Sequence, residues 1–189
     1  MALDHLRAAV LATRRAQVLC RARTGYAVPV LGSPDKLGAI TSAAAVFSEG
    51  GIAYALIGGL AVSVRSGVPR ATLDVDFAIS TQVDRSWLSE RLAQRGFRQT
   101  GEFAHSVNFE HESGEPVPLA FDAAFDPMID RAEALRFGDL ELRVVTKEDL
   151  IAMKRRAASD PWRRRSKALR DLADIALLEE DAPSPDEGW

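Results

Sequence analysis

The chain has 189 residues, of which 47% are hydrophobic and 27% are charged, and its formal net charge is −3. This length and composition are typical of one globular domain with a substantial core. The single cysteine, Cys20, excludes a disulfide within the chain and favours a reducing compartment. Charges are mixed into the N-terminal apolar positions and no apolar run is as long as a membrane span, so we expect a cytoplasmic protein without a membrane anchor.

Hydrophobic periodicity and turn residues predict helices and strands along most of the chain. In chain order these are a helix (2–23), a helix (34–49, with Ser33 as N-cap and Pro34 first), a strand (52–57), a helix (60–66), a strand (73–79), a helix (81–95), two strands around a Gly-Glu turn (97–110), a strand (117–125), a helix (127–136), a strand (140–145), a helix (147–158, with Thr146 and Asp149 as a capping box) and a helix (161–180). Strands this apolar need a sheet, so the order predicts an α/β (α+β) protein with helices at both ends.

We divide the chain into four parts. These are an N-terminal helix and connector (1–36), a core (37–145), C-terminal helices (146–180) and a polar tail that we expect to be flexible (181–189).

The stretch after the first predicted strand combines two features of a phosphate and metal site. Gly58 and Gly59 come between that strand and a short helix, where glycines let a ligand approach the backbone and the helix N-terminus offers free N–H groups. Asp74 and Asp76 follow on one face of the next predicted strand, while its apolar residues, beginning with Leu73, point the other way.

Two carboxylates about 7 Å apart in a partly buried strand repel each other and raise each other's pKa unless a cation lies between them. Mg²⁺, or Mn²⁺ in its place, binds through one or two carboxylates together with substrate phosphates. A phosphate cradle beside such a site predicts phosphoryl or nucleotidyl transfer by in-line displacement. The sequence lacks the glycine-rich motifs of P-loop and dinucleotide-binding proteins, which argues against those classes.

The pattern Gly58-Gly59, fourteen residues, Asp74-Val75-Asp76 resembles the signature of the nucleotidyltransferase fold. The surrounding sequence is most similar to AbiEii-type toxin nucleotidyltransferases, as are the later segments RVVTKEDLIAMKRRA and RRRSKALRDLADIALL. The resemblance covers residues 52–178. It implies a mixed central sheet flanked by helices, with residues 37–145 as the nucleotidyltransferase core and a helical C-terminal part.

The resemblance also implies which residues bind the nucleotide. Gly58 and Gly59 would hold the triphosphate of an NTP such as ATP. Lys154, on a late helix, would pair with its phosphates. Arg70 and Thr72, just before the aspartates, would support the phosphates or their loop.

The metal ligands implied by the resemblance are Asp74, Asp76 and Asp122, with Asp122 binding a second ion or helping to deprotonate the attacking hydroxyl. Asp171 would complete the catalytic site or orient the lysine. Asp126 competes with Asp122 as the third carboxylate, because positions four apart on a strand share a face. We favour Asp122, since Asp126 precedes a proline at the end of the predicted strand, where helix capping is its natural role.

Positive charge is concentrated late in the chain. Residues 154–170 contain eight basic residues and one acidic residue. Such a patch can neutralise an NTP or follow an RNA backbone, and the alternative is a solvated helix surface. Trp162 is the only aromatic residue in this run, which argues against a stacking platform for single strands.

We therefore predict a Mg²⁺-dependent enzyme that moves an NMP from an NTP to an acceptor hydroxyl and releases pyrophosphate. By resemblance, the acceptor is RNA, such as a tRNA 3′ end, and the protein is the toxin of a toxin–antitoxin pair with a cognate antitoxin. Two alternatives remain open. One is a small-molecule transferase, for example one that adenylylates an antibiotic, and the other is a non-catalytic nucleotide-sensing module of the same fold.

Overall fold

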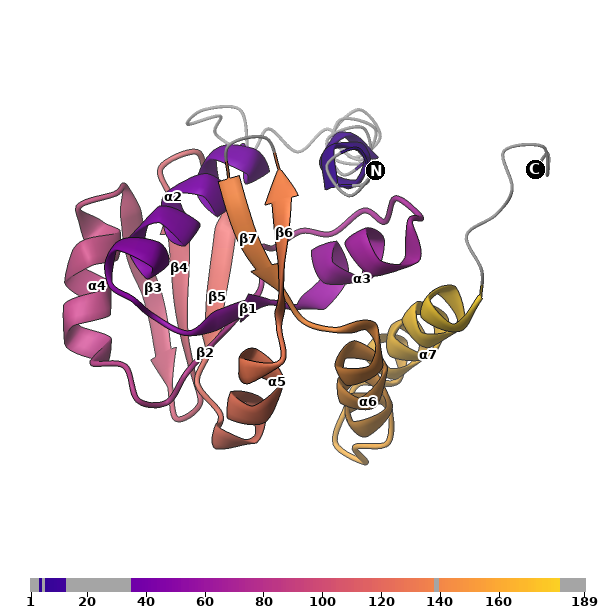
Figure 1. Cartoon of the computed structure of the whole chain (residues 1–189). Coiled ribbons are helices and arrows are strands. Elements are labelled where there is room, and N and C mark those ends of the chain that lie inside the picture. The colour runs from indigo at the N-terminus through magenta and orange to yellow at the C-terminus, as the bar shows by residue number, and fades with distance from the viewer. Residues whose placement is uncertain (1–3, 5, 13–34, 138–139, 181–189) are drawn as a thin grey trace, which may run out of the picture.

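The computed structural model describes residue 4 and residues 6–12, 35–137 and 140–180. Residues 4 and 6–12 are helical. The later elements are α2 (Lys36–Glu49), β1 (Tyr54–Leu56), α3 (Gly58–Ser66), β2 (Phe77–Ile79), α4 (Arg85–Ala93), β3 (Phe97–Phe103), β4 (Ser106–His111), β5 (Pro116–Ala120), the 3₁₀ helix η1 (Ala123–Phe125), α5 (Asp126–Asp130), β6 (Glu133–Phe137), β7 (Leu140–Val144), α6 (Lys147–Ala158) and α7 (Arg165–Glu179) (Figure 1). None of the described helices has the length and hydropathy needed to cross a membrane.

Within the described residues, seven strands form one mixed sheet in the order β3-β4-β5-β2-β1-β7-β6, which confirms the predicted fold class. The central strand β1 pairs antiparallel with β2 and parallel with β7, and β2 pairs parallel with β5. The remaining neighbours, β3–β4, β4–β5 and β6–β7, are antiparallel. All residues of β1 and β2 are buried, as expected of central strands that are covered on both faces.

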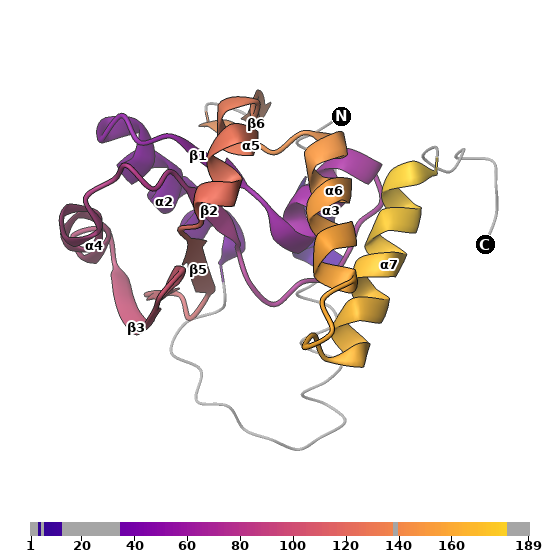
Figure 2. The same ribbon diagram turned by 90° about the horizontal axis from the view of Figure 1, so that it is seen from below.

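The helices form two groups around the sheet. The Phe47 ring of α2 packs on Tyr54 of β1 and Phe77 of β2, with ring centroids 4.8 and 5.2 Å apart. At the other end of the molecule from α4, helices α6 and α7 pack side by side and contact α3 (Figure 1 and Figure 2). The start of α3 therefore lies between the sheet and the C-terminal helices.

Several predicted boundaries are wrong. Helix α2 begins at Lys36 and is capped by Asp35, whose carboxylate accepts a hydrogen bond from the Gly38 N–H at 3.0 Å, in place of the expected Ser33. Helix α7 begins at Arg165, four residues after the expected start, and the predicted helix 127–136 is divided between α5 and β6. The turn between β3 and β4 lies at residues 104–105 instead of the Gly-Glu pair. The predicted helix 2–23 lies outside the described residues from position 13 onward.

Candidate active site

Gly58 brings the start of α3 against an aspartate. Helix α3 begins two residues after β1, and Gly58 has a φ of 69°, which residues with a side chain rarely adopt. A Cβ at Gly58 would also overlap the carboxylate of Asp76. The preceding residue, Ile57, offers no side-chain cap, so the first turn of α3 presents its N–H groups next to Asp76.

Gly59 is in equally close contact with Arg70 and Thr72. A Cβ at this position would overlap the guanidinium of Arg70 and lie 2.8 Å from Thr72 Oγ1. The Thr72 hydroxyl in turn donates a hydrogen bond to Asp74 Oδ1 at 3.2 Å. The structure thus brings the two glycines, Arg70, Thr72 and the aspartate pair together.

Asp74 and Asp76 lie in an extended segment just before β2, not within a strand that starts at residue 73. The segment still follows the sheet. The Val75 N–H donates to the Pro116 carbonyl, and the Ile57 N–H donates to the Asp76 carbonyl, both at 3.0 Å. The segment that carries the aspartates is therefore hydrogen-bonded to Pro116 of β5 on one side and to Ile57, after β1, on the other.

The environment of Asp76 makes its ionised form unfavourable. Burial, followed by the charge of Asp74, raises the pKa of Asp76 to about 7, while nearby cations oppose this shift. In decreasing order of effect these cations are Lys154, Arg70 and Lys36. Asp76 is thus a half-buried acid that lacks enough positive charge around it to stay fully ionised at neutral pH.

This donor set fits a hard divalent cation. A cation bound between the two carboxylates would favour the ionised form of Asp76, and Mg²⁺ or Mn²⁺ would take its remaining oxygen ligands from phosphates and water. In the part of the chain that the structure describes, no group of three or more His, Cys, Asp or Glu residues could hold a metal ion. The contribution of the described residues would therefore be limited to the pair Asp74 and Asp76.

The structure does not bring Asp122 to this pair. The parallel register of β2 and β5 places Asp76 level with Pro118, and Asp122 lies four residues farther along, a distance of about 13 Å in an extended chain. The strand β5 ends at Ala120, and Asp122 instead caps η1 by accepting a hydrogen bond from the Ala124 N–H at 2.9 Å. The prediction that Asp122 lies within a strand is wrong, and its proposed role as third metal ligand is not supported by this arrangement.

Asp126, the alternative third carboxylate, is the first residue of α5 and is already bound. It accepts hydrogen bonds from the Thr81 N–H at 3.0 Å and from the Thr81 hydroxyl at 2.6 Å. These bonds connect the start of α5 to the loop after β2. We interpret Asp126 as a structural residue of that loop.

Lys154 lies in a buried charge cluster between α6 and α7. Its ammonium nitrogen is 3.0 Å from Asp171 Oδ1 and 2.8 Å from Asp174 Oδ2. The second oxygen of Asp171 contacts Arg163 Nε at 2.5 Å, and Asp174 Oδ1 contacts Arg70 Nε at 2.6 Å. Arg70 therefore links the cluster on the C-terminal helices to Gly59 at the start of α3.

Asp174 is a member of the cluster that the sequence did not single out, whereas Asp171 was expected at the site. Both are almost fully buried, and the side-chain oxygen Asp174 Oδ2 has no aligned hydrogen bond although Lys154 is in ion-pair distance. The available signal is their i, i+3 spacing, which places both carboxylates on one face of α7. A second feature that the sequence did not reveal is the buried ion pair of Lys36 with Glu115.

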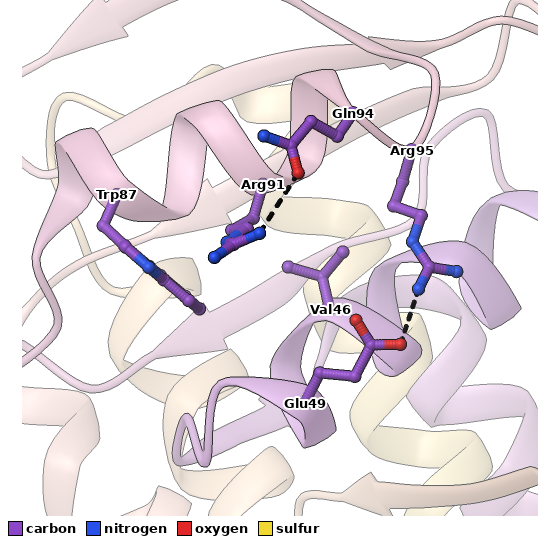
Figure 3. Close-up of a pocket in the computed structure, with 6 residues that line it drawn as sticks. All are labelled: Val46, Glu49, Trp87, Arg91, Gln94 and Arg95. Carbon is purple, nitrogen blue, oxygen red and sulfur yellow. Dashed lines mark hydrogen bonds and ion pairs between the residues drawn. The ribbon is translucent and has the colours of Figure 1, made fainter.

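A separate pocket of about 300 Å³ lies between α2 and α4 (Figure 3). Helix α4 lies at the other end of the molecule from α6 and α7 (Figure 1). It is lined by Val46, Glu49, Trp87, Arg91, Gln94 and Arg95. The guanidinium of Arg91 lies 5.4 Å from the centre of the Trp87 ring, and Arg95 pairs with Glu49 at 2.5 Å. The pocket contains none of the predicted site residues, and we do not place the reaction there.

A helix that starts at a glycine pair, next to two aspartates on a mixed sheet, defines a protein of the nucleotidyltransferase fold, and solved structures agree. An antigenic nucleotidyltransferase-like protein from Paracoccidioides brasiliensis has a TM-score of 0.52 and 23% identity, over 78% of this chain and 77% of that chain. Lincosamide antibiotic adenylyltransferase LnuA, bound to lincomycin, has a TM-score of 0.53 and 16% identity, over 72% and 91%. ANT(2")-Ia in complex with adenylyl-2"-tobramycin has a TM-score of 0.51 and 20% identity, over 74% and 85%. At these identities the similarity shows the fold.

The family is shown by sequence. The family model described as "Nucleotidyl transferase AbiEii toxin, Type IV TA system" matches residues 42–187. The chain therefore belongs to the AbiEii nucleotidyl transferase toxin family, which confirms the resemblance seen in the sequence. A comparison with curated proteins gives no match.

Proposed function

We propose that this protein transfers an NMP from an NTP to an acceptor hydroxyl, with Asp74 and Asp76 holding Mg²⁺ or Mn²⁺. The acceptor hydroxyl loses its proton to water, its oxygen forms a bond to the α-phosphorus, and the bond from that phosphorus to pyrophosphate breaks. The observation that carries the proposal is the contact of Asp76 with Gly58. Because of this contact, a metal bound by the carboxylates would lie next to a phosphate bound at the start of α3. When bound, the cation supplies positive charge to the reacting phosphate.

The charge cluster on the C-terminal helices suits the phosphates of the nucleotide. Lys154, Arg163 and Arg70 carry three positive charges against the two negative charges of Asp171 and Asp174. The net positive charge lies close to Asp76, whose pKa responds to Lys154 and Arg70. We assign Lys154 and Arg70 to phosphate binding, with Asp171 orienting Lys154 through their ion pair.

The surface next to this cluster supports RNA as the acceptor. Three of the eight basic residues in 154–170 are paired with carboxylates, namely Lys154, Arg155 and Arg163. The other five are exposed and have no ion pair within the described part of the chain: Arg156, Arg164, Arg165, Lys167 and Arg170. Trp162, 93% exposed, lies among them. Unpaired cations bind a phosphodiester backbone, and one exposed indole can stack on a single base.

A small-molecule acceptor is the second candidate. It is favoured by the shared fold with LnuA and ANT(2")-Ia, whose structures contain lincomycin and adenylyl-2"-tobramycin. A non-catalytic nucleotide sensor is the third. From the family we also propose a cognate antitoxin as partner.

One labelling experiment separates these candidates. The protein is incubated with each α-labelled NTP, Mg²⁺ or Mn²⁺, and either total RNA or a panel of hydroxyl-bearing antibiotics. We expect label on RNA with wild-type protein and none with Asp74→Ala or Asp76→Ala. Label on an antibiotic alone would favour the second candidate. Stabilisation by an NTP without any labelled product would favour the sensor. Transfer by either alanine variant at the wild-type rate would contradict the metal site.

A further inference from the structure

Lys36, the first residue of α2, is almost completely buried and its charge is used inside the protein. It is 2% exposed, and its ammonium group forms an ion pair with the equally buried Glu115. The same ammonium donates a hydrogen bond to the main-chain carbonyl of Leu73 at 2.8 Å. One side chain therefore joins α2, the residue before β5 and the segment that carries the aspartate pair.

Stability alone does not explain a lysine at this position. Burial of the ammonium is costly, and the positive end of the α2 dipole makes a cation at the first helical residue less favourable still. Glu115 and the Leu73 carbonyl offset these costs, but an apolar pair of similar volume is often as stable or more stable than a buried ion pair. The contact with Leu73 indicates what the lysine adds.

Leu73 directly precedes Asp74 and is not fixed by packing of its own side chain. That side chain is 69% exposed, contrary to the expectation that it faces the core. After Asp74 the main chain is held by the Val75 bond to Pro116 and by the bond of Asp76 to Ile57. Lys36 holds the chain on the other side of Asp74, and its partner Glu115 directly precedes Pro116. The main chain before Asp74 and the main chain after it are therefore both anchored at the start of β5.

We propose that Lys36 is a positioning residue for the carboxylate pair. By holding the Leu73 carbonyl, it places Asp74 and Asp76 at the distance from the start of α3 that metal binding needs. Lys36 acts through Leu73 and also through its charge, which favours the ionised form of Asp76. Because it is buried, it contacts neither nucleotide nor acceptor. This inference rests on the proposed function of the pair as a metal site.

The test compares variants that separate the ion pair from the contact with Leu73. Lys36→Met with Glu115→Met replaces both charges by apolar groups of similar length and removes the contact. Glu115→Gln breaks the charge pair but leaves the lysine on Leu73, and it serves as the matched control. Mn²⁺ affinity is measured by isothermal titration calorimetry without nucleotide, and stability by urea unfolding.

We expect the double variant to fold and to bind Mn²⁺ about tenfold more weakly, as when a residue that supports a metal ligand is lost. Glu115→Gln should be less stable than wild type and keep its Mn²⁺ affinity within about twofold, because the contact with Leu73 persists. In transfer assays, the double variant should need more metal and recover its rate when metal is saturating. Wild-type Mn²⁺ affinity in the double variant would overturn the proposal.

A backbone variant keeps the proposal testable if the double variant does not fold. An ester in place of the amide between Leu73 and Asp74 weakens the Leu73 carbonyl as an acceptor and leaves the ion pair intact. We expect this variant to bind Mn²⁺ about threefold more weakly, which corresponds to the loss of a fraction of one hydrogen bond. An unchanged Mn²⁺ affinity would contradict the role of the contact. Failure of the proposed metal site itself is distinguishable, because the wild-type protein would then not bind Mn²⁺ or would bind it equally after Asp74→Asn.

Discussion

Replacement of Asp76 by asparagine is expected to stabilise the metal-free protein at pH 8 and to abolish its stabilisation by divalent cations. Asparagine has nearly the same shape as aspartate but does not ionise. In the folded wild-type protein, burial and then the charge of Asp74 raise the pKa of Asp76 from 3.8 to about 7. The variant therefore removes a charge that the folded protein accommodates poorly.

The sign and size of the effect follow from linkage. Folding takes up a proton at Asp76 between the unfolded pKa of 3.8 and the folded pKa of about 7. The contribution of this group to stability is therefore fully present below pH 4, is lost as the pH rises to 7 and is constant above that. A shift of this size corresponds to a few kcal/mol, so the stability gained by the variant should grow over the same range and level off above pH 7.

The assay is urea unfolding of both proteins in EDTA at several values between pH 4 and pH 8, repeated at pH 8 with Mn²⁺. The difference between the unfolding free energies of the two proteins is used, because the titration of other groups cancels in it. Mn²⁺ at 100 times its dissociation constant should stabilise the wild-type protein by about 2.7 kcal/mol and leave the variant unchanged. Asp122→Asn is the matched control: it keeps its capping oxygen and should respond to Mn²⁺ like the wild type. A stability difference that does not depend on pH, or an equal response of Asp76→Asn to Mn²⁺, would refute the reasoning.

Three further predictions concern the surroundings of the pair. Gly58→Ala should destabilise the protein by at least about 1 kcal/mol, the cost of a left-handed conformation. It should also abolish transfer, because the added Cβ overlaps Asp76. A wild-type transfer rate would contradict the close approach of the two residues. Lys154→Met should lower the free energy of unfolding in urea by about 3 kcal/mol, because Asp171 and Asp174 lose a buried partner. The control is Arg155→Met, at the next residue, which forms an exposed pair. It should change the free energy of unfolding by less than about 1 kcal/mol. Exchange of Lys167 and Arg170 for glutamate should weaken RNA binding and make it less dependent on salt, as measured by filter binding. Mn²⁺ affinity, measured by calorimetry, should not change. An unchanged salt dependence would show that these residues do not contact RNA.

The failures of the sequence interpretation have a common physical origin. Periodicity predicts that residues 117–125 form a strand, but the strand ends at Ala120, where Asp122 turns the chain by capping η1. The distance of Asp122 from Asp76 depends on the register between β2 and β5, which is set by pairing of segments about 40 residues apart in sequence. Neither the point where pairing stops nor its register is encoded in the local pattern of apolar residues.

What the sequence determines by itself is local. Gly58 and Gly59 between a strand and a helix, and Asp74 and Asp76 one residue apart, predict the cradle and the carboxylate pair, because these properties depend on backbone conformation and on the two-residue period of an extended chain. The same patterns carry the family resemblance, which the family match over residues 42–187 confirms.

What only the tertiary structure decides are the charges around that pair. Lys36 and Glu115 are 79 positions apart, and Arg70 reaches Asp174 from another element, so no spacing rule predicts either contact. In the sequence Lys36, Glu115 and Asp174 look like ordinary surface charges, and Arg70 is identified only by its place just before the aspartates. Packing of α2 on the sheet buries Lys36 and Glu115, and packing of α7 against α3 buries Asp174 beside Arg70. A charge removed from water in this way persists only with a partner.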